Sequence, residues 1–204
     1  MIVIIDYGVG NVHSILNMFK KIGVEAKLSE SPEELLLADK VILPGVGSFD
    51  YGMKQLKETG YYDFVIKYAK EIKKPLLGIC LGMQMLGLSS EEGNEPGLGL
   101  IPFKNVKFRF ENTKLKVPHM GWNIVKSNKP NEKFSEDFTE DYRFYFVHSY
   151  YAVCENESNV LLTCDYGNEF AAAVQQDHIY GVQFHPEKSH RFGMQLLKNF
   201  SELE

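Results

Sequence analysis

The sequence predicts an α/β protein built on an open, mostly parallel β-sheet with an antiparallel extension in its C-terminal half. In the first half, short apolar runs alternate with segments of helical period, which is typical of parallel strands joined by helices that cover both faces of a sheet. From about residue 98 onward, strand-like runs follow one another with only turn residues between them, which indicates antiparallel neighbours. No repeat, low-complexity tract or linker interrupts the chain, so we expect residues 1–204 to form one domain.

The N-terminal elements follow in order from the apolar pattern. "MIVIID" is a β-rich run, and residues 11–23 carry apolar side chains at helical spacing until Gly23 ends the helix. "VEAKL" is strand-like. "SPEELLLA" predicts a helix start, with Ser31 as N-cap, Pro32 at the first helical position and Glu34 completing a capping box.

The next segments lead to a cysteine. "KVILPGVG" is predicted to be a strand that enters a glycine-bearing loop, "GYYDFVIKYAKEIKK" an amphipathic helix, and "PLLGIC" a fully apolar strand. The strand-like runs of the second half are "GLIPFKNVKFRF", "KLKVPHM", "WNIVK", "YRFYFVHSYYAVC", "NVLLTC", "EFAAAVQQ" and "HIYGVQF". A C-terminal helix near "SHRFGMQLLKNFSEL" closes the predicted fold.

Composition excludes several classes of protein. The formal net charge of −5 disfavours a nucleic-acid binder, which usually carries a basic excess. No apolar run approaches the roughly 18 residues of a membrane helix, and the N-terminus lacks the basic lead of a signal peptide. The three cysteines Cys80, Cys154 and Cys164 form neither a CxxC pair nor a disulfide framework. These features together favour a cytoplasmic protein.

The pattern Gly78-Ile79-Cys80-Leu81-Gly82 has the form of a nucleophile elbow with sulfur in place of the serine oxygen. Such a turn between strand and helix puts the sulfur near a helix N-terminus, which favours the thiolate. The N–H of Leu81 is then expected to point to where an oxyanion forms. Alone, the pattern leaves catalysis and simple packing of a buried cysteine both open.

A histidine and a glutamate in "GVQFHPEKS" complete the requirements of a cysteine nucleophile. Pro186 disfavours a helical backbone at His185. In an extended chain, residues two apart point to one side, so His185 and Glu187 are expected to share a face, as a base and its orienting carboxylate do. The alternative is a surface His-x-Glu pair without function.

Gly45, Val46 and Gly47 follow the strand "KVIL", at the sheet edge where open α/β sheets bind ligands. The exposed N–H groups of this loop are candidates to complete an oxyanion hole with Leu81, and a simple turn is the alternative. "DYGVGN" fails as a dinucleotide-binding fingerprint because the third glycine falls at His13. A metal site of Cys80, His148 and His185 lacks any recognised ligand spacing and is rejected.

Together, "PGVGSF", "GICLGMQML" and "GVQFHPEKS" resemble the class I (triad) glutamine amidotransferases, whose sheet is flavodoxin-like, over essentially the whole chain. More narrowly, "DYGVGN", "PHMGWN" and "YFVHSY" resemble the family of glutaminase subunits of imidazole glycerol phosphate synthase. The resemblance implies Cys80 as nucleophile, His185 as base and acid, and Glu187 as orienting carboxylate. It also implies that Gly47, Gln84, His148, Ser149 and Tyr150 hold L-glutamine, without any cofactor or metal.

The narrower resemblance further implies a heterodimer with a (βα)₈-barrel cyclase subunit. That subunit would receive ammonia through an internal tunnel and make imidazole glycerol phosphate and AICAR in histidine biosynthesis. Asn11, Trp122, Asn123, Tyr145 and Lys188 match family positions at the subunit interface, although core packing is an alternative for Trp122 and Tyr145. Two other functions stay open: ammonia supply to a sugar-amidating synthase of surface polysaccharide biosynthesis, and a non-catalytic scaffold.

Overall fold

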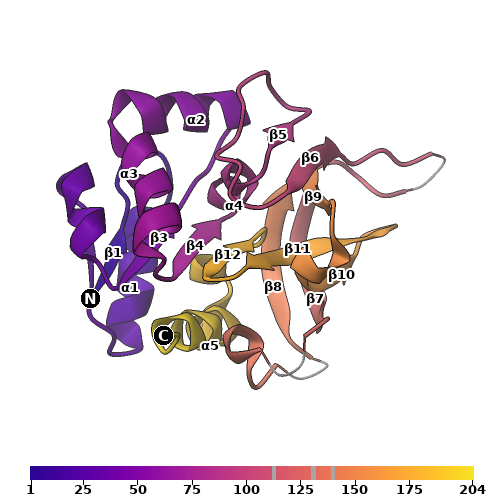
Figure 1. Cartoon of the computed structure of the whole chain (residues 1–204). Coiled ribbons are helices and arrows are strands. Elements are labelled where there is room, and N and C mark those ends of the chain that lie inside the picture. Colours follow the sequence, from indigo (N-terminus) through magenta and orange to yellow (C-terminus); the bar gives the residue numbers. More distant parts are fainter. Residues whose placement is uncertain (112–113, 130–131, 139–140) are drawn as a thin grey trace.

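The computed structural model describes residues 1–111, 114–129, 132–138 and 141–204. Its main sheet has the strand order β2-β1-β3-β4-β12-β11-β10-β7-β8 (Figure 1). The first half of this order is parallel throughout. Its strands are β1 (Ile2–Ile4), β2 (Ala26–Leu28), β3 (Lys40–Leu43), β4 (Leu76–Ile79) and β12 (Ile179–Val182).

The remaining strands of the order pair antiparallel, as the second half of the sequence predicts. They are β7 (His119–Ser127), β8 (Arg143–His148), β10 (Val160–Asp165) and β11 (Glu169–Gln176). Beside them lie β5 (Ser89–Ser90), β6 (Phe103–Lys107) and β9 (Tyr150–Cys154), with β9 pairing to both β6 and β11. The predicted fold class, an open and mostly parallel sheet with an antiparallel extension, is confirmed.

The run "YRFYFVHSYYAVC", expected as one strand-like segment, is divided at Ser149. β8, before the division, pairs with β7, whereas β9, after it, pairs with β6 and β11. The chain therefore changes strand partners at Ser149, and this corner becomes part of the site described below.

The described helices cover the parallel half of the sheet. They are α1 (Val12–Lys21), α2 (Phe49–Glu58), α3 (Tyr61–Lys67), α4 (Leu81–Leu86) and α5 (His190–Ser201), with a π-helical turn at Tyr68–Ile72 after α3. Short 3₁₀ helices lie at Pro32–Leu37, Lys133–Ser135, Glu157–Asn159 and Pro186–Lys188. None of these described helices is long and apolar enough to cross a membrane.

Two local expectations need correction. Helix α2 was not predicted, because the glycines before it indicate a loop, yet Phe49, Gly52, Met53 and Leu56 bury one helical face. The capping box at Ser31 is wrong. The segment forms a six-residue 3₁₀ helix without a side-chain cap, and the Glu34 carboxylate pairs instead with the Lys27 ammonium at 3.0 Å.

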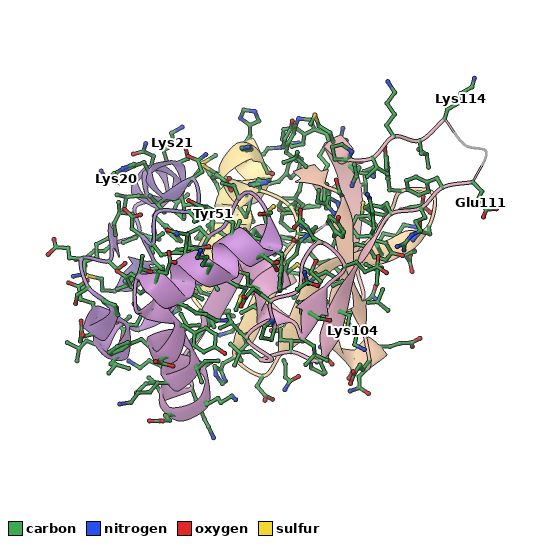
Figure 2. All side chains as sticks on the ribbon, turned by 90° about the horizontal axis from the view of Figure 1, so that it is seen from above. Lys20, Lys21, Tyr51, Lys104, Glu111 and Lys114 are labelled. Atoms are coloured by element: carbon green, nitrogen blue, oxygen red, sulfur yellow. The ribbon has the colours of Figure 1, made fainter. Side chains whose placement is uncertain are left out.

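Strand β1 shows how the sheet is sealed on both faces. Ile2 and Ile4 join the apolar cluster that contains α1 and α5, whereas Val3 and Ile5 join the cluster that contains α2 and α3. Successive side chains of a strand point to opposite faces, so a strand covered on both sides must be apolar throughout. On the other side of the molecule, Glu111 and Lys114 lie away from the body (Figure 2).

We expect Ile4→Ala to lower the free energy of unfolding by about 2–5 kcal/mol, because the methyl groups it removes are fully buried. Leu37→Ala is the matched control, since the Leu37 side chain is 86% exposed and its removal should change that free energy by less than about 0.5 kcal/mol. Urea denaturation of both variants measures the difference. Equal losses would contradict the assignment of β1 to the core.

Candidate active site

Cys80 occupies a strained turn between β4 and α4. Its backbone angles are φ 55° and ψ −109°, a region that residues with a side chain rarely adopt. The turn closes tightly because Gly82 lies directly against the Leu43 carbonyl, where a β-carbon would collide. A β-carbon at Gly78 would lie 2.7 Å from the Gly82 carbonyl oxygen. The two glycines of the elbow pattern are thus required by close approach.

The neighbouring parallel strand brings His185 to the same sheet edge. β12 pairs with β4 so that Val182 stands opposite Ile79, and the Cys80 N–H donates to the Val182 carbonyl at 2.8 Å. His185 follows β12 with the extended backbone that Pro186 predicts. Its N–H donates to the Tyr145 carbonyl of β8 at 2.9 Å, which fixes the residue between two parts of the sheet.

The His185 ring lies between an acid and a thiol. Its Nδ1 is 2.7 Å from Glu187 Oε1, and both side chains are almost fully buried. Burial alone would lower the pKa of His185, but hydrogen bonds to Cys80 and Glu187 and the negative charge of both partners outweigh it and raise that pKa to about 10. The imidazole therefore holds a proton at neutral pH beside the Cys80 sulfur.

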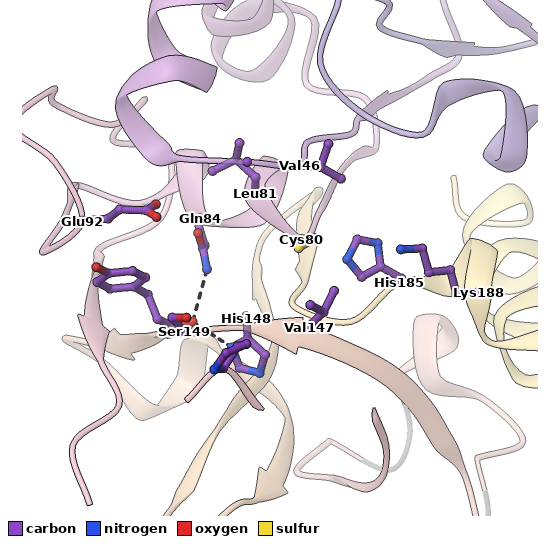
Figure 3. A pocket seen from close by; sticks show the side chains of 13 residues that line it. Val46, Cys80, Leu81, Gln84, Glu92, Val147, His148, Ser149, His185 and Lys188 are labelled. Atoms are coloured by element: carbon purple, nitrogen blue, oxygen red, sulfur yellow. Dashed lines mark hydrogen bonds between the residues drawn. The ribbon is translucent and has the colours of Figure 1, made fainter. Parts of the chain in front are cut away.

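A cavity of about 380 Å³ opens in front of these residues (Figure 3). Most of the residues that the sequence assigns to the triad and to glutamine binding line it, whereas Glu187 and Gly45 are not among its lining residues. The expected residues on the wall are Val46, Gly47, Cys80, Leu81, Gln84, His148, Ser149, Tyr150 and His185, together with Lys188 from the interface set. Ser149 reaches the cavity because the chain turns from β8 to β9 there.

The glycine loop closes on the expected oxyanion donor. The Leu81 N–H donates to the Gly45 carbonyl at 3.3 Å, so the donor faces the loop's own oxygen in this structure. Gly47 has a φ of 96°, which only glycine adopts easily. Rotation of the Gly45–Val46 peptide would turn that carbonyl away and bring the Val46 N–H to the same side.

Two residues near the candidate triad were not predicted from the sequence. Gln183 is fully buried, its Nε2 lies 3.9 Å from Cys80 Sγ, and its Oε1 accepts from Gln84 Nε2 at 3.0 Å. Its position two residues before His185 is the signal that could have found it. Glu92 lines the cavity and accepts from the Phe49 N–H at 2.8 Å. Nothing in the segment "SSEEGNEP" distinguishes this glutamate from its neighbours.

Comparison with known proteins decides the family. The family "Glutamine amidotransferase class-I" matches residues 3–203. The chain belongs to the class I glutamine amidotransferases. It is 58% identical to "Imidazole glycerol phosphate synthase subunit HisH 2" of Methanococcus maripaludis over 98% of both chains. It is 54% identical to the protein of that name in Pseudomonas aeruginosa, over the full length of both. The predicted family and enzyme class are thereby confirmed.

Solved structures of lower identity share the fold of this glutamine amidotransferase. "PurLQS from Thermotoga maritima" aligns with a TM-score of 0.72 at 17% identity and covers 98% of this chain and 96% of that one. The glutaminase domain of "Trypanosoma brucei CTPS" aligns with a TM-score of 0.68 at 15% identity and covers 100% and 94%. Both comparisons confirm the open-sheet fold.

Three of the residues expected at the interface, two aromatic residues and a lysine, form one cluster. Trp122 is 44% exposed, which excludes simple core packing, and its ring meets Tyr145 edge-on with centroids 6.3 Å apart. The Lys188 ammonium lies 5.9 Å from the centre of the Tyr145 ring. Asn123 is half-buried and donates from Nδ2 to the Asp165 carbonyl at 2.8 Å, and Asn11 precedes α1 without a side-chain cap.

For the other buried histidines and cysteines, burial decides the direction of the pKa shift. Burial lowers the pKa of His119 to about 4 and, with the charge of His185 and His119, that of His148 to about 3. Burial raises the pKa of Cys154 to about 11 and that of Cys164 to about 12, so both stay thiols at neutral pH. Within the described ranges, no three His, Cys, Asp or Glu side chains are grouped to hold a metal.

The two neutral histidines predict an acid-sensitive stability. Because their folded pKa values lie below the unfolded value of about 6.5, the unfolded chain binds more protons below that pH. The free energy of unfolding should therefore fall from pH 6.5 to 5 by up to about 1.4 kcal/mol per pH unit for each histidine. His185, with its raised pKa, is protonated in the folded state throughout this window and contributes no loss.

Urea denaturation between pH 7 and pH 5 measures this slope. His119→Phe removes one of the two groups and should reduce the slope by up to half. A slope that is the same in the variant and the wild-type protein would contradict the neutral, buried state of His119.

Proposed function

We propose that this chain hydrolyses L-glutamine to glutamate and ammonia through Cys80, His185 and Glu187. The observation that carries the proposal is the strained Cys80 at a helix start, on a cavity wall that it shares with His185, whose Nδ1 lies 2.7 Å from Glu187 Oε1. A cysteine thiolate, an imidazole and an orienting carboxylate are the parts that amide hydrolysis by covalent catalysis needs.

The reaction follows from these positions. Cys80 Sγ attacks the side-chain amide carbon of glutamine, and His185 gives its proton to the leaving nitrogen as the C–N bond breaks, which releases ammonia. His185 then takes a proton from water, whose oxygen attacks the thioester carbon. The C–S bond breaks, glutamate leaves, and the thiolate and imidazolium are restored. The N–H groups of Leu81 and of the glycine loop would stabilise the oxyanion in both halves.

The cavity offers a negative charge for the α-ammonium group of the substrate. Glu92 lies on one side of the cavity and Lys188 on the other (Figure 3). We assign Glu92 to the α-ammonium of glutamine, and the backbone at Gly47, Ser149 and Tyr150, with Gln84, to its remaining polar groups. A carboxylate facing an ammonium gives the charge-assisted hydrogen bond that such recognition requires.

The ammonia would pass to a (βα)₈-barrel cyclase subunit in a heterodimer that makes imidazole glycerol phosphate and AICAR. The relatives are named as subunits of imidazole glycerol phosphate synthase, which implies a second subunit for those proteins. In this chain, Met120, Trp122 and Ile124 occupy every second position of β7 and therefore share one face of the strand. All three are exposed, and an exposed apolar face is typical of a surface that binds a partner. We assign Asn11, Asn123, Tyr145 and Lys188 to the same interface.

A different acceptor of the ammonia also has specific support. Two relatives bear the numeral 2 after the subunit name, which distinguishes them from another subunit of that name. A duplicate glutaminase is what ammonia supply to a sugar-amidating synthase would require. Reconstitution with the barrel proteins encoded in the same genome decides which one consumes the ammonia. A non-catalytic scaffold would require neither the His185–Glu187 contact nor the strain at Cys80.

Cys80 should be the residue that a glutamine-like electrophile labels in the assembled complex. Cys154 and Cys164 should stay unlabelled, because their raised pKa values keep them as thiols near neutral pH. Mass spectrometry locates the label. Cys80→Ser should abolish glutamine-dependent synthesis while the complex still uses added ammonia. Label on another cysteine, or glutamine-dependent turnover in the variant, would contradict the proposed chemistry.

The contact between Leu81 and the Gly45 carbonyl predicts a weak glutaminase that its partner activates. Because the Leu81 N–H is bound to the Gly45 carbonyl, the isolated chain lacks one donor of its oxyanion hole. Removal of one such donor typically lowers kcat by about 10²–10³-fold. We expect the rate to rise by that order when the partner and its nucleotide substrate are both added. Asn11 and Lys188, beside the loop and the cavity, are the residues assigned to transmit the change.

Glutaminase assays on the chain alone, with the partner, and with partner and nucleotide measure this switch. Lys188→Met keeps the length of the side chain and removes its charge, and should weaken the activation more than the basal rate. Equal rates under all three conditions would show that the oxyanion hole is already formed.

A further inference from the structure

Two buried histidines, of which His148 lines the cavity, take no part in the bond-forming and bond-breaking steps of the proposed hydrolysis. His119 begins β7 and His148 ends β8, and the two stand opposite each other in the strand register. Their side chains are joined: His119 Nδ1 lies 2.9 Å from His148 Nε2. At that distance one nitrogen must donate and the other accept.

The neighbouring groups fix which nitrogen donates. His148 Nδ1 lies 2.8 Å from the Tyr150 carbonyl oxygen, which can only accept, so Nδ1 carries the hydrogen and Nε2 carries the lone pair. His119 must then donate from Nδ1, and its Nε2 is left to accept from Asn123 Nδ2 at 3.4 Å. The hydrogen bonds therefore run in one direction, from Asn123 through His119 and His148 to Tyr150.

The series continues to the nucleophile. The Tyr150 carbonyl also accepts from Gln84 Nε2 at 3.2 Å, and the same nitrogen donates to Gln183 Oε1 at 3.0 Å. Gln183 Nε2 in turn points to Cys80 Sγ. The nitrogen of Gln84 thus faces Tyr150, and its oxygen lies on the opposite side (Figure 3).

Aromatic packing holds the His119 ring in the plane that this geometry needs. The ring stacks between Phe146 and Tyr166, with centroid separations of 4.8 and 4.0 Å. Phe108 packs edge-on against both His119 and His148. A ring confined in this way cannot turn to exchange its two nitrogens.

We propose that His119 is a positioning residue for glutamine binding. Its Nδ1–H holds His148, and His148 fixes the Tyr150 carbonyl and through it the amide of Gln84 in the orientation that receives the substrate. This inference rests on the proposed glutaminase function. Because Asn123 lies next to Trp122 on β7, the same series of bonds links the partner-facing strand to the substrate site.

Nitrogen-15 NMR of histidine-labelled protein tests the hydrogen bonds without reference to activity. We expect both His119 and His148 to be neutral at pH 7 and protonated on Nδ1, whereas imidazole in water prefers the Nε2 form. Signals are assigned by loss in His119→Phe and His148→Phe. Protonation of either ring on Nε2, or on both nitrogens, would overturn the series.

Kinetics of the assembled complex test the role. His119→Phe keeps an aromatic ring but leaves His148 Nε2 without its donor. The loss of this buried hydrogen bond should raise the KM for glutamine about tenfold. We expect kcat at saturating glutamine and synthesis from added ammonia to stay within about twofold. His119→Asn places an amide N–H near the former Nδ1 and should recover most of the wild-type KM.

His178→Phe is the matched control, because the His178 ring also binds a backbone carbonyl, that of Ala69 at 2.8 Å, but lies outside the series. Its KM should equal that of the wild-type protein. An unchanged KM in His119→Phe, or an equal rise in His178→Phe, would overturn the role of His119. A wild-type complex without glutaminase activity would instead overturn the proposed function, and the NMR result would still decide the hydrogen bonds.

Discussion

The close approach of the Cys80 turn to strand β3 is the constraint on which the site depends. A nucleophile can stand in a left-handed backbone conformation only if its surroundings determine that conformation. Here the Gly82 backbone lies against the Leu43 carbonyl, and the Cys80 N–H is bound to Val182. The elbow is therefore fixed by the strands on both sides of β4, and the same two strands lead into the glycine loop and into His185.

The three histidines of the site show that burial alone does not set a protonation state. His185 and His148 line the same cavity and are both nearly inaccessible to solvent. Glu187 and the Cys80 sulfur outweigh burial at His185 and raise its pKa, whereas burial dominates at His148 and lowers its pKa, although the Tyr150 carbonyl acts in the opposite direction. Under the proposed function, the charged imidazole would transfer protons, and the two neutral imidazoles would fix hydrogen-bond geometry.

The sequence predicted those features that local patterns encode. Alternation of strands and helices indicated the parallel sheet, the glycines around Cys80 indicated the elbow, and the residue before Pro186 was expected to be extended. Pairings between distant segments could not be predicted. Trp122 and Asn123 were both assigned to the interface, yet side chains alternate along β7, so Trp122 is exposed while the Asn123 amide faces the buried His119. Gln183 is likewise meaningful only once β12 lies beside the elbow.

The glycine loop and the hydrogen-bonded histidines restrict the substrate site from opposite sides. The loop can change because Gly47 tolerates its positive φ and a single peptide rotation would exchange a carbonyl for an N–H at Leu81. The Tyr150 side cannot change in this way, because both lone pairs of its carbonyl are already engaged by His148 and Gln84. A partner that binds across β7 and the loop would thus find one adjustable wall and one fixed wall. Under the proposed function, such a division would let the oxyanion hole be switched without losing the geometry proposed to recognise the substrate.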